Sequence, residues 1–373
     1  MTYPRDAWVE VDPGAIAENC RTLKRLTPEG IRFMAVVKAD GYGHGAVEVA
    51  RAALAAGADR LGVASVDEAV ALRDAGIGAP VQLLSEAPEE AAATIIEYRI
   101  VPTIATREGA VALSRAAMIA GVEALYHLKI DTGMNRIGVR AEDAAEFATW
   151  LSGMPGISLE GAFTHFATAD APGDWDFERQ VKRFRTALED LRTEGIRPTL
   201  VHAANSAATV LHPETHHDMV RCGIALYGLH PSPATHGRVA LVPAMSVKAR
   251  VSFVKRIGLG EGVSYGLTWQ ADGPTTIATL PLGYADGVHR VLSNQMEVLI
   301  GGRRCAQVGR VCMDQLMVAV PSGVHVAQGD EAVLVGTQGA ERIDMDELAG
   351  KAGTINYELA CGFALRLERR FRG

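Results

Sequence analysis

The chain has 373 residues, 48% of them apolar, and its 37 Lys and Arg against 44 Asp and Glu give a formal net charge of −7. This size predicts a globular protein of two domains, because a domain usually holds about 100–200 residues. The mildly acidic balance argues against a nucleic-acid partner. No apolar stretch reaches the roughly 18–20 residues of a membrane span, and no apolar segment follows a basic start at the N-terminus. We therefore expect a cytoplasmic protein with no nucleic-acid and no membrane partner.

The cysteine pattern bears on two kinds of site, disulfide frameworks and structural zinc sites. The cysteines are scattered, odd in number and free of any CxxC spacing, at Cys20, Cys222, Cys305, Cys312 and Cys361. This pattern is not that of a disulfide framework or a structural zinc site. We expect reduced thiols and no metal.

Between about residues 14 and 225, short apolar runs alternate with longer Ala-rich segments of helical periodicity, which is typical of βα units. The expected strands are at residues 33–38, 61–64, 81–84, 101–104, 124–130, 159–164, 199–203 and 218–222. Ser65 and Thr106 stand where helices should begin, and Gly76 and Gly121 where they should end. Eight strands favour a parallel (β/α)8 barrel. A doubly wound open sheet is the alternative, but no GxGxxG follows the first strand.

The alternation of apolar runs and helical segments ends at a Pro/His/Gly-rich linker over residues 230–237. Beyond it, β-branched runs are broken by Gly, Asp and Pro turns, and one helix is expected at residues 345–353. We therefore predict an N-terminal barrel domain over residues 1–236 and a mostly β domain over residues 237–373. The strand-like segment at residues 7–12 precedes the barrel and could join either domain.

Polar residues follow the expected strands where a barrel places its active site, at the C-terminal ends. These residues are Lys38 after the first strand, Lys129 and Arg136 after the fifth, His165 after the sixth, His202, Asn205 and Ser206 after the seventh, and Arg221 and Gly223 after the eighth. All of them should converge on one mouth of the barrel.

Lys38 ends an otherwise apolar run. A low dielectric there favours the neutral amine, which can attack a carbonyl, although a lysine at a strand end can also extend into solvent. The loops after the last two strands of a barrel commonly hold phosphate, and Asn205 and Ser206 stand in the first of them. In the simpler interpretation Asn205 or Ser206 only caps a helix. A Schiff-base lysine facing a phosphate site indicates pyridoxal phosphate.

The stretch AVVKADGYGHG, which contains Lys38, resembles the pyridoxal-phosphate lysine signature of bacterial alanine racemases. Further segments resemble that family in order and spacing, so that the resemblance spans about residues 7–365: LKIDTGMNRIG, HAANSAA, MVRCGIALYG, EGVSYG, PLGYADG, VGRVCMDQLMV and NYELACG. The family has an N-terminal (β/α)8 barrel and a C-terminal β domain. The resemblance implies a pyridoxal 5'-phosphate enzyme that interconverts L- and D-alanine and supplies D-alanine for peptidoglycan.

The resemblance also implies the catalytic residues. Lys38 would hold the cofactor as an aldimine and exchange a proton on one face of the substrate Cα. Tyr265 from a second subunit would serve the other face, which implies a head-to-tail homodimer with shared active sites. Arg221 would face the pyridine nitrogen and leave it unprotonated, because an arginine keeps its proton. This arrangement disfavours transamination.

The remaining roles are implied in the same way. The phosphate would be bound by Tyr42, Ser206, Tyr357 and the backbone at Gly223 and Ile224, with Asn205 ordering the loop. The substrate carboxylate would contact Arg136 and the backbone of Met313. Supporting positions are His165 and His202 beside Arg221, Lys129, which is carbamylated in some relatives, and Tyr284, Cys312 and Asp314 near the substrate entrance.

Two alternatives remain at this stage. A decarboxylase of the same fold should present a carboxylate to the pyridine nitrogen, which Arg221 argues against. A broad-specificity or serine racemase is harder to exclude, since a pocket gains or loses only about 1–3 kcal/mol per methylene. One departure from the family is Gly41, where an Ala often precedes the tyrosine; this removes no chemical group.

Overall fold

The computed structural model describes residues 6–171 and 175–372. The chain forms two compact units, Gly14–Pro243 and Met1–Pro13 with Ala244–Gly373. The N-terminal strand β1 (Ala7–Val11) pairs antiparallel with β12 (Met245–Arg250) and parallel with β22 (Glu368–Phe371). It therefore belongs to the sheet of the C-terminal part of the chain.

In the described part of the 14–243 unit, eight strand positions form two hydrogen-bonded parallel sheets that together make a barrel. They are β2 (Arg32–Val36), β3 (Arg60–Val63), β4 (Val81–Leu83), β5 (Ile100–Val101) with β6 (Thr103–Ile104), β7 (Ala124–Asp131), β9 (Ile157–Phe163), β10 (Leu200–His202) and β11 (Met219–Cys222). Asp218 N donates to Val201 O over 3.0 Å and Arg221 N to Ala204 O over 3.0 Å, which joins β11 to β10. The predicted (β/α)8 barrel is confirmed.

Each expected strand lies within two residues of an observed one. Pro102 divides β5 from β6 because proline has no N–H for the ladder. The short β8 (Val139–Arg140) adds to β7 after the fifth strand position. The apolar runs thus marked the strands well, because strands buried on both faces are almost continuously apolar.

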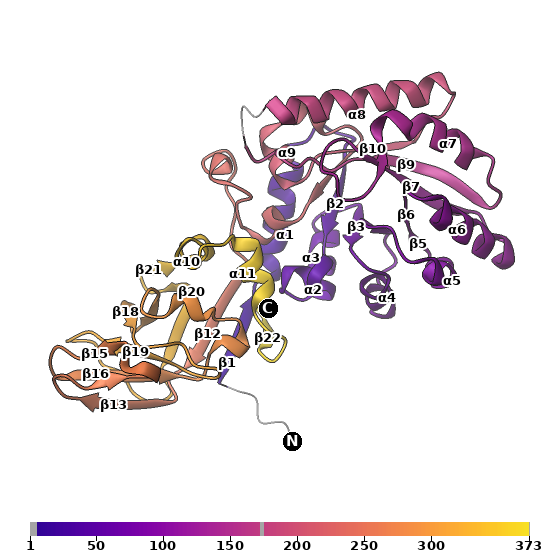
Figure 1. Ribbon diagram of the computed structural model, residues 1–373. Helices are drawn as coiled ribbons and strands as arrows, with labels where there is room; N and C mark the ends of the chain where they lie inside the picture. Colours follow the sequence, from indigo (N-terminus) through magenta and orange to yellow (C-terminus); the bar gives the residue numbers. More distant parts are fainter. Residues whose placement is uncertain (1–5, 172–174, 373) are drawn as a thin grey trace. The chain divides into compact units, whose positions relative to one another are not determined.

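The helices between the strands lie outside the barrel (Figure 1). They are α1 (Pro13–Lys24), α3 (Ala46–Ala55), α4 (Val66–Asp74), α5 (Ala92–Glu97), α6 (Arg107–Ala120), α7 (Ala144–Ser152), α8 (Trp175–Thr193) and α9 (Ser206–Leu211), with 3-10 turns η1 (Glu89–Ala91), η2 (Ala141–Asp143), η3 (Pro213–Thr215), η4 (Ile224–Tyr227) and η5 (Pro233–Thr235). The segment labelled α2 (Lys38–Tyr42) is a left-handed turn and not a regular helix. The expected caps are present. Ser65 and Thr106 accept from the backbone at the starts of α4 and α6, and Gly121 ends α6 in the left-handed conformation.

The other unit is mostly β. Its large sheet has the order β13-β16-β19-β18-β17-β20-β12-β1-β22, with β21 beside β20. The strands not yet defined are β13 (Phe253–Ile257), β14 (Gly262–Val263), β15 (Trp269–Gln270), β16 (Thr275–Leu280), β17 (Glu297–Ile300), β18 (Arg303–Gln307), β19 (Leu316–Val320), β20 (Glu331–Gln338) and β21 (Glu341–Ile343), and the 3-10 turns are η6 (Tyr265–Leu267), η7 (Tyr284–Asp286) and η8 (Arg290–Leu292). All pairings in this sheet are antiparallel except β1 with β22. The mostly β C-terminal part is confirmed.

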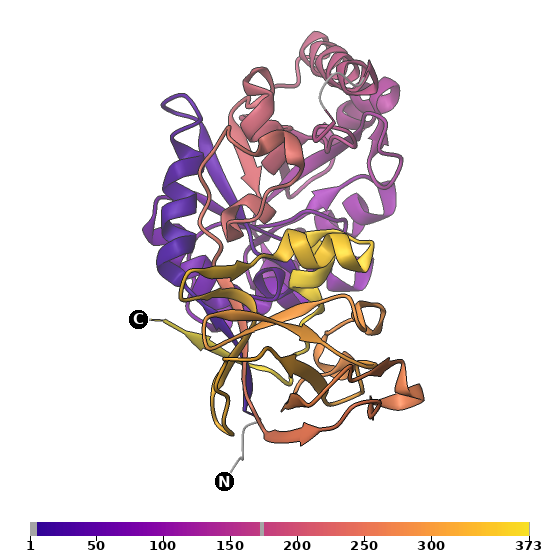
Figure 2. The same ribbon diagram turned by 90° about the vertical axis from the view of Figure 1, so that its left-hand side faces the viewer.

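Two helices complete this unit, α10 (Met345–Ala352) and α11 (Asn356–Gly362). They lie together on one side of the orange strands (Figure 2). The first was expected and begins at Asp344, whose side chain accepts from Glu347 N over 2.8 Å. The second was not expected, because seven residues ending in glycine give little periodic signal.

Two of the expectations drawn from composition concern membrane-spanning helices and the state of the cysteines. Within residues 6–171 and 175–372, no helix is long and apolar enough to cross a membrane. All five cysteines are free thiols, as predicted.

Candidate active site

Lys38 stands immediately before an unusual backbone turn at the C-terminal end of β2. The four residues that follow it have left-handed backbone angles, with φ of 51° at Ala39, 50° at Asp40, 62° at Gly41 and 52° at Tyr42. A left-handed conformation costs roughly 1–2 kcal/mol for each residue other than glycine. The turn therefore persists only because its surroundings hold it. Lys38 itself is half-buried.

Hydrogen bonds on both sides hold this turn. The backbone oxygen of Asp40 accepts from Gly45 N over 2.8 Å, and its carboxylate accepts from Ala46 N over 2.9 Å. Ala39 N donates to Glu68 Oε1 over 2.7 Å, while the other oxygen of Glu68 accepts from the backbone just before α4. Glu68 thus ties the residue after Lys38 to the neighbouring βα loop.

The turn delivers Tyr42 to the loop after β11. The tyrosine is almost fully buried and its ring centre lies 4.9 Å from that of Tyr227. A Cβ at Gly223 would lie only 2.4 Å from Tyr42 Oη, so the phenol occupies space that any other residue at 223 would fill. Ser206 Oγ accepts from Gly223 N over 3.0 Å. Two hydroxyl groups therefore meet at one glycine turn, where a phosphate could accept from both.

Asn205 and Ser206 have different tasks. Asn205 caps α9, because its side chain accepts from Ala208 N over 3.0 Å. Ser206 instead contacts the turn at Gly223, where Ala225 N also lies 3.4 Å from its Oγ. Ile224 is buried at the start of η4.

Arg221 is buried at the end of β11 and donates to four acceptors. Nη1 lies 3.0 Å from His202 Nδ1, and Nη2 donates to Thr164 O over 2.8 Å and to Ala203 O over 3.0 Å. His165 Nδ1 lies 3.3 Å from the same Nη2. Burial lowers the pKa of Arg221 to about 9, which leaves the guanidinium charged at neutral pH.

The surroundings of Arg221 are strongly cationic. Burial first, and then the charges of Arg221 and Arg136, hold the pKa of Lys129 well below its ordinary value. Its Nζ lies 4.1 Å from the centre of the Phe163 ring. Burial and the charge of Arg221 also hold the pKa of His165 well below its usual range. The site thus favours a neutral imidazole and an uncharged Lys129 beside a fixed guanidinium.

Arg136 lies on the loop after β7 and is exposed. The carboxylate of Asp131 shapes this loop by accepting from Gly133 N over 3.0 Å and from Asn135 N over 3.1 Å. Lys38, Arg136 and Arg221 all lie close enough to act electrostatically on Lys129 and His165, so these five residues are neighbours.

The remaining expected residues belong to the 244–372 unit: Tyr265, Tyr284, Cys312, Met313, Asp314 and Tyr357. Tyr265 is 73% exposed and Met313 53% exposed. Ser264 Oγ donates to Arg310 O over 2.7 Å and lies 3.3 Å from Cys312 Sγ, while Tyr284 N donates to Cys312 O over 2.9 Å. These hydrogen bonds join the loops that carry Tyr265 and Tyr284 to the 310–312 segment, and both tyrosines and Met313 are exposed.

The other two expected residues of this unit are Asp314, which pairs with an arginine, and Tyr357, which lies on a helix. Arg366 donates to the carboxylates of Asp314 and Asp286, each over 2.6 Å, and so fixes the turn that carries Tyr284. Tyr357 is half-buried on α11.

Sequence reasoning missed two groups of charged residues. A groove of about 800 Å³ beside the Tyr265 loop contains Arg290 and Arg310. Inside the barrel, Arg60, His127 and Glu160 contact one another beneath Arg221. The available signal was the presence of His127 and Lys129 at alternate positions of an apolar strand, which places both on one face.

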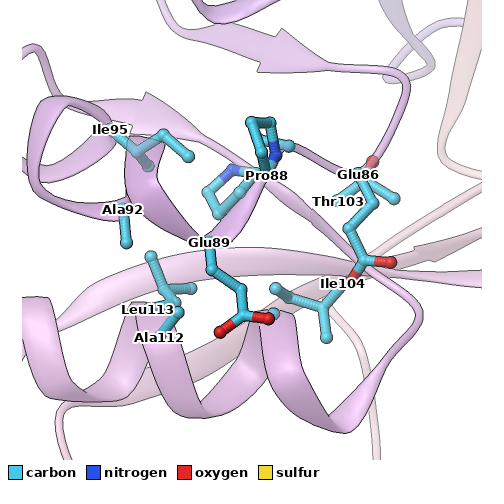
Figure 3. A pocket seen from close by; sticks show the side chains of 12 residues that line it. Glu86, Pro88, Glu89, Ala92, Ile95, Thr103, Ile104, Ala112 and Leu113 are labelled. Carbon is cyan, nitrogen blue, oxygen red and sulfur yellow. The ribbon is translucent and has the colours of Figure 1, made fainter.

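A separate small cavity of about 20 Å³, enough for one or two waters, lies among η1, α5, β6 and α6 (Figure 3). Its Glu86 side chain accepts from Ala105 N over 2.9 Å and from Thr106 N over 3.0 Å. Glu86 thus secures the start of α6, and the cavity is lined mainly by apolar residues. It contains none of the expected site residues.

Comparison with known proteins shows the family to which the chain belongs. Residues 11–231 match the family described as alanine racemase, N-terminal domain, and residues 244–371 match alanine racemase, C-terminal domain. The chain belongs to the alanine racemase family. It is 48% identical to an alanine racemase of Symbiobacterium thermophilum over 99% of this chain and 98% of that protein.

Solved structures of this family are similar throughout. The alanine racemase of Bacillus anthracis with bound L-Ala-P has a TM-score of 0.94 and 39% identity, covering 100% of this chain and 96% of that one. A histidine racemase of Leuconostoc mesenteroides has a TM-score of 0.91 and 32% identity, covering 100% of both chains. The alanine racemase fold thus also occurs in a racemase named for another amino acid.

Proposed function

We propose that this protein interconverts L- and D-alanine with pyridoxal 5'-phosphate. The observation that carries the proposal is the constellation of Lys38, Tyr42 and Arg221 at the ends of the barrel strands, in a chain that matches alanine racemases along almost its whole length. A supply of D-alanine for peptidoglycan and a cytoplasmic location belong to the same proposal.

The residues of the barrel suit this cofactor. Tyr42, Ser206 and the turn at Gly223 and Ile224 would hold the phosphate, with Asn205 ordering the loop, and the 2.4 Å that separates a Cβ at Gly223 from the Tyr42 hydroxyl supports a need for glycine there. Tyr357 would add a further hydroxyl. When bound, pyridoxal phosphate supplies a carbonyl that links covalently to an amine and a ring that withdraws electrons from the substrate Cα.

Arg221 would face the ring nitrogen. Its guanidinium is donor-only and remains charged at neutral pH, so the ring nitrogen stays an acceptor. This limits the delocalisation of charge into the ring and favours return of the proton to the substrate Cα. His165 and His202 orient Arg221 through the hydrogen bonds described above.

Racemisation requires proton transfer on both faces of the substrate Cα. We assign one face to the Nζ of Lys38 and the other to the hydroxyl of Tyr265 of the partner subunit. Tyr265 is 73% exposed on its own unit, which supports a role toward a second chain. The proposal therefore includes a homodimer with shared active sites.

The substrate carboxylate would be bound by Arg136 and by the backbone of Met313. Arginine suits a carboxylate because its planar fork can donate two parallel hydrogen bonds. Tyr284, Cys312 and Asp314 would shape the entrance, since hydrogen bonds join the loops that carry them.

Lys129 adds a modification to the proposal. Its lowered pKa favours the free amine, which can add to carbon dioxide to give a carbamate and release one proton. The new negative charge would pair with Arg136, whose positive charge helps to keep the amine of Lys129 unprotonated. Native mass measurement at neutral pH should show the added carboxylate, which acid should remove; an unmodified native mass would contradict this assignment.

The function is tested by incubating the purified protein with pyridoxal phosphate and L-alanine in deuterated water, followed by chiral analysis. D-alanine with deuterium at Cα is the expected product. Serine and histidine serve as comparison substrates, because the histidine racemase has the same fold. If deuterium entered serine or histidine much faster than alanine, the substrate would have to be reassigned. If deuterium entered none of the three amino acids, the proposal would be refuted.

A further inference from the structure

A continuous chain of hydrogen bonds runs through the barrel beneath Arg221. Arg221 Nη1 lies 3.0 Å from His202 Nδ1, and His202 Nε2 lies 2.7 Å from His127 Nδ1. His127 Nε2 lies 2.8 Å from Glu160 Oε2, and Arg60 Nη2 donates to Glu160 Oε1 over 2.6 Å. The two imidazoles are fully buried, and only the Glu160 side chain at the far end is partly exposed, at 14%.

An irregularity in β9 creates the acceptor at the far end. Tyr126 pairs with Leu159 but the next residue, His127, pairs with Gly161, so Glu160 has no partner residue on β7. Such a bulge re-aims a side chain that regular alternation would send to the other face. A Cβ at Gly161 would lie 2.5 Å from His127 Cε1, so glycine is required for the imidazole to pack there.

The Arg221 end of the chain sets the order of the protons in it. At the other end, His127 Nε2 faces the Glu160 carboxylate at 2.8 Å and Arg60 Nη1 at 3.3 Å, and of these two only the carboxylate can accept its proton. Arg221 can only donate, so His202 Nδ1 must accept. A neutral His202 then carries its proton on Nε2 and donates to His127 Nδ1. His127 in turn carries its proton on Nε2 and donates to Glu160, which is an acceptor when ionised.

The surrounding charges support this proton order. Burial, followed by the charge of Arg221, holds the pKa of His202 well below its usual range. Burial also lowers the pKa of His127, although its hydrogen bond to Glu160 opposes the shift. Burial raises the pKa of Glu160, but hydrogen bonds from His127 and Arg60 outweigh it and leave that pKa at about 2. His127, Lys129 and Arg60 are the further groups that face His202, and a positive charge on any of them would lower its pKa as well.

Packing leaves His202 little freedom to rearrange. Its ring is stacked on Phe163, with centres 4.6 Å apart and an interplanar angle of 7°. A proton on Nδ1 would oppose the Arg221 donor at 3.0 Å. A rotation of the ring would break the contacts on both of its nitrogens.

We propose that Glu160, acting through His127, is a positioning residue that keeps the proton of His202 on Nε2 so that Nδ1 accepts from Arg221. Arg60 holds the Glu160 carboxylate in place through both guanidinium nitrogens, over 2.8 and 2.6 Å. The consequence for catalysis rests on the proposed function, whereas the proton order does not.

The direct test is nitrogen NMR of the protein labelled with ¹⁵N-histidine, without substrate, between about pH 6 and pH 9, which brackets the ordinary histidine pKa. His127 and His202 should each show one protonated nitrogen, Nε2, throughout this range, and a His127→Gln variant helps to assign the signals. A wild-type His202 with its proton on Nδ1, or with both nitrogens protonated, overturns the proposal. This result does not depend on which amino acid the enzyme racemises.

The matched variants are Glu160→Gln and Glu160→Asp. An amide has one acceptor oxygen, for which Arg60 competes with two donors, so Glu160→Gln should mix the tautomers of His202. In that variant kcat should fall about 10- to 100-fold, which corresponds to one charge-assisted hydrogen bond, with little change in KM. Glu160→Asp should retain the tautomer and most of kcat. Unaltered tautomers and kcat in Glu160→Gln would show that Glu160 positions nothing.

Discussion

The left-handed turn after Lys38 can be tested at Gly41. Its φ is +62°, and an added Cβ would lie 3.2 Å from both the Cα and the N of Ala46. Gly76 provides a matched control in the same unit, because its φ is +80° and a Cβ there would have no atom within 4 Å. The two positions share the backbone penalty and differ in the contact.

The magnitude follows from these two parts. A left-handed alanine costs roughly 1–2 kcal/mol. Replacing glycine also reduces the entropy of the unfolded chain and returns about 0.4–1 kcal/mol. Gly76→Ala should therefore lower the free energy of unfolding by about 1 kcal/mol. Gly41→Ala must in addition move the backbone at Ala46 by a few tenths of an ångström, which costs up to about 1 kcal/mol more, the lower end of the usual overpacking range.

Urea unfolding of the two variants and the wild type measures this difference, and both glycines report on the same unit. The Gly41→Ala variant should unfold at a slightly lower urea concentration than Gly76→Ala and keep its activity, because an alanine often precedes this tyrosine in the family that the sequence resembles. Equal midpoints for the two variants would refute the argument that close packing against Ala46 holds the turn.

Three further outcomes are expected. Tyr265→Phe should still bind pyridoxal phosphate but lose proton exchange mainly in one direction, measured by deuterium entry into each enantiomer of alanine; normal exchange in both directions would remove Tyr265 from its assigned role opposite Lys38. Gly223→Ala should displace the Tyr42 hydroxyl and raise the Kd of pyridoxal phosphate about 10- to 100-fold, and an unchanged Kd in a titration would separate Tyr42 from the phosphate. The pKa of Glu160 falls from 4.5 to about 2 on folding, so its contribution to stability is complete above about pH 4.5 and is lost as the pH falls toward 2. Urea midpoints of Glu160→Gln should therefore depend less on pH over that window than those of the wild type; parallel curves would contradict the sign.

Much of the barrel could be predicted because its strands are short, apolar and regularly spaced. Helix ends were also readable where a side chain makes the cap, as at Ser65, Thr106 and Asn205. The position of Lys38 was predicted less well. It lies after the strand and not at its end, because the chain leaves β2 at Val36. No local preference predicts left-handed angles at Ala39 and Asp40, since tertiary hydrogen bonds impose them.

The candidate site, too, was predictable from the sequence only in part. Polar residues after apolar strands identified the residues gathered around Arg221, because the C-terminal ends of barrel strands meet at one mouth. The partners beneath Arg221 could not be found in this way. Glu160 reaches His127 only through the bulge in β9, and a bulge depends on the pairing register of two strands that are far apart in sequence.

Because of the bulge, the number of residues in β9 determines whether the hydrogen-bond chain beneath Arg221 has its final acceptor. The segment from Ile157 to Phe163 carries one residue more than its pairing with β7 uses, and the surplus residue is the one that carries the carboxylate. Deleting residue 160 would leave every other pair in the ladder matched while removing the final acceptor of the hydrogen-bond chain. The deletion would also remove the carbonyl that accepts from Thr199 N and Oγ1, each over 2.9 Å, so a one-residue change in length would be felt both next to β10 and at Arg221.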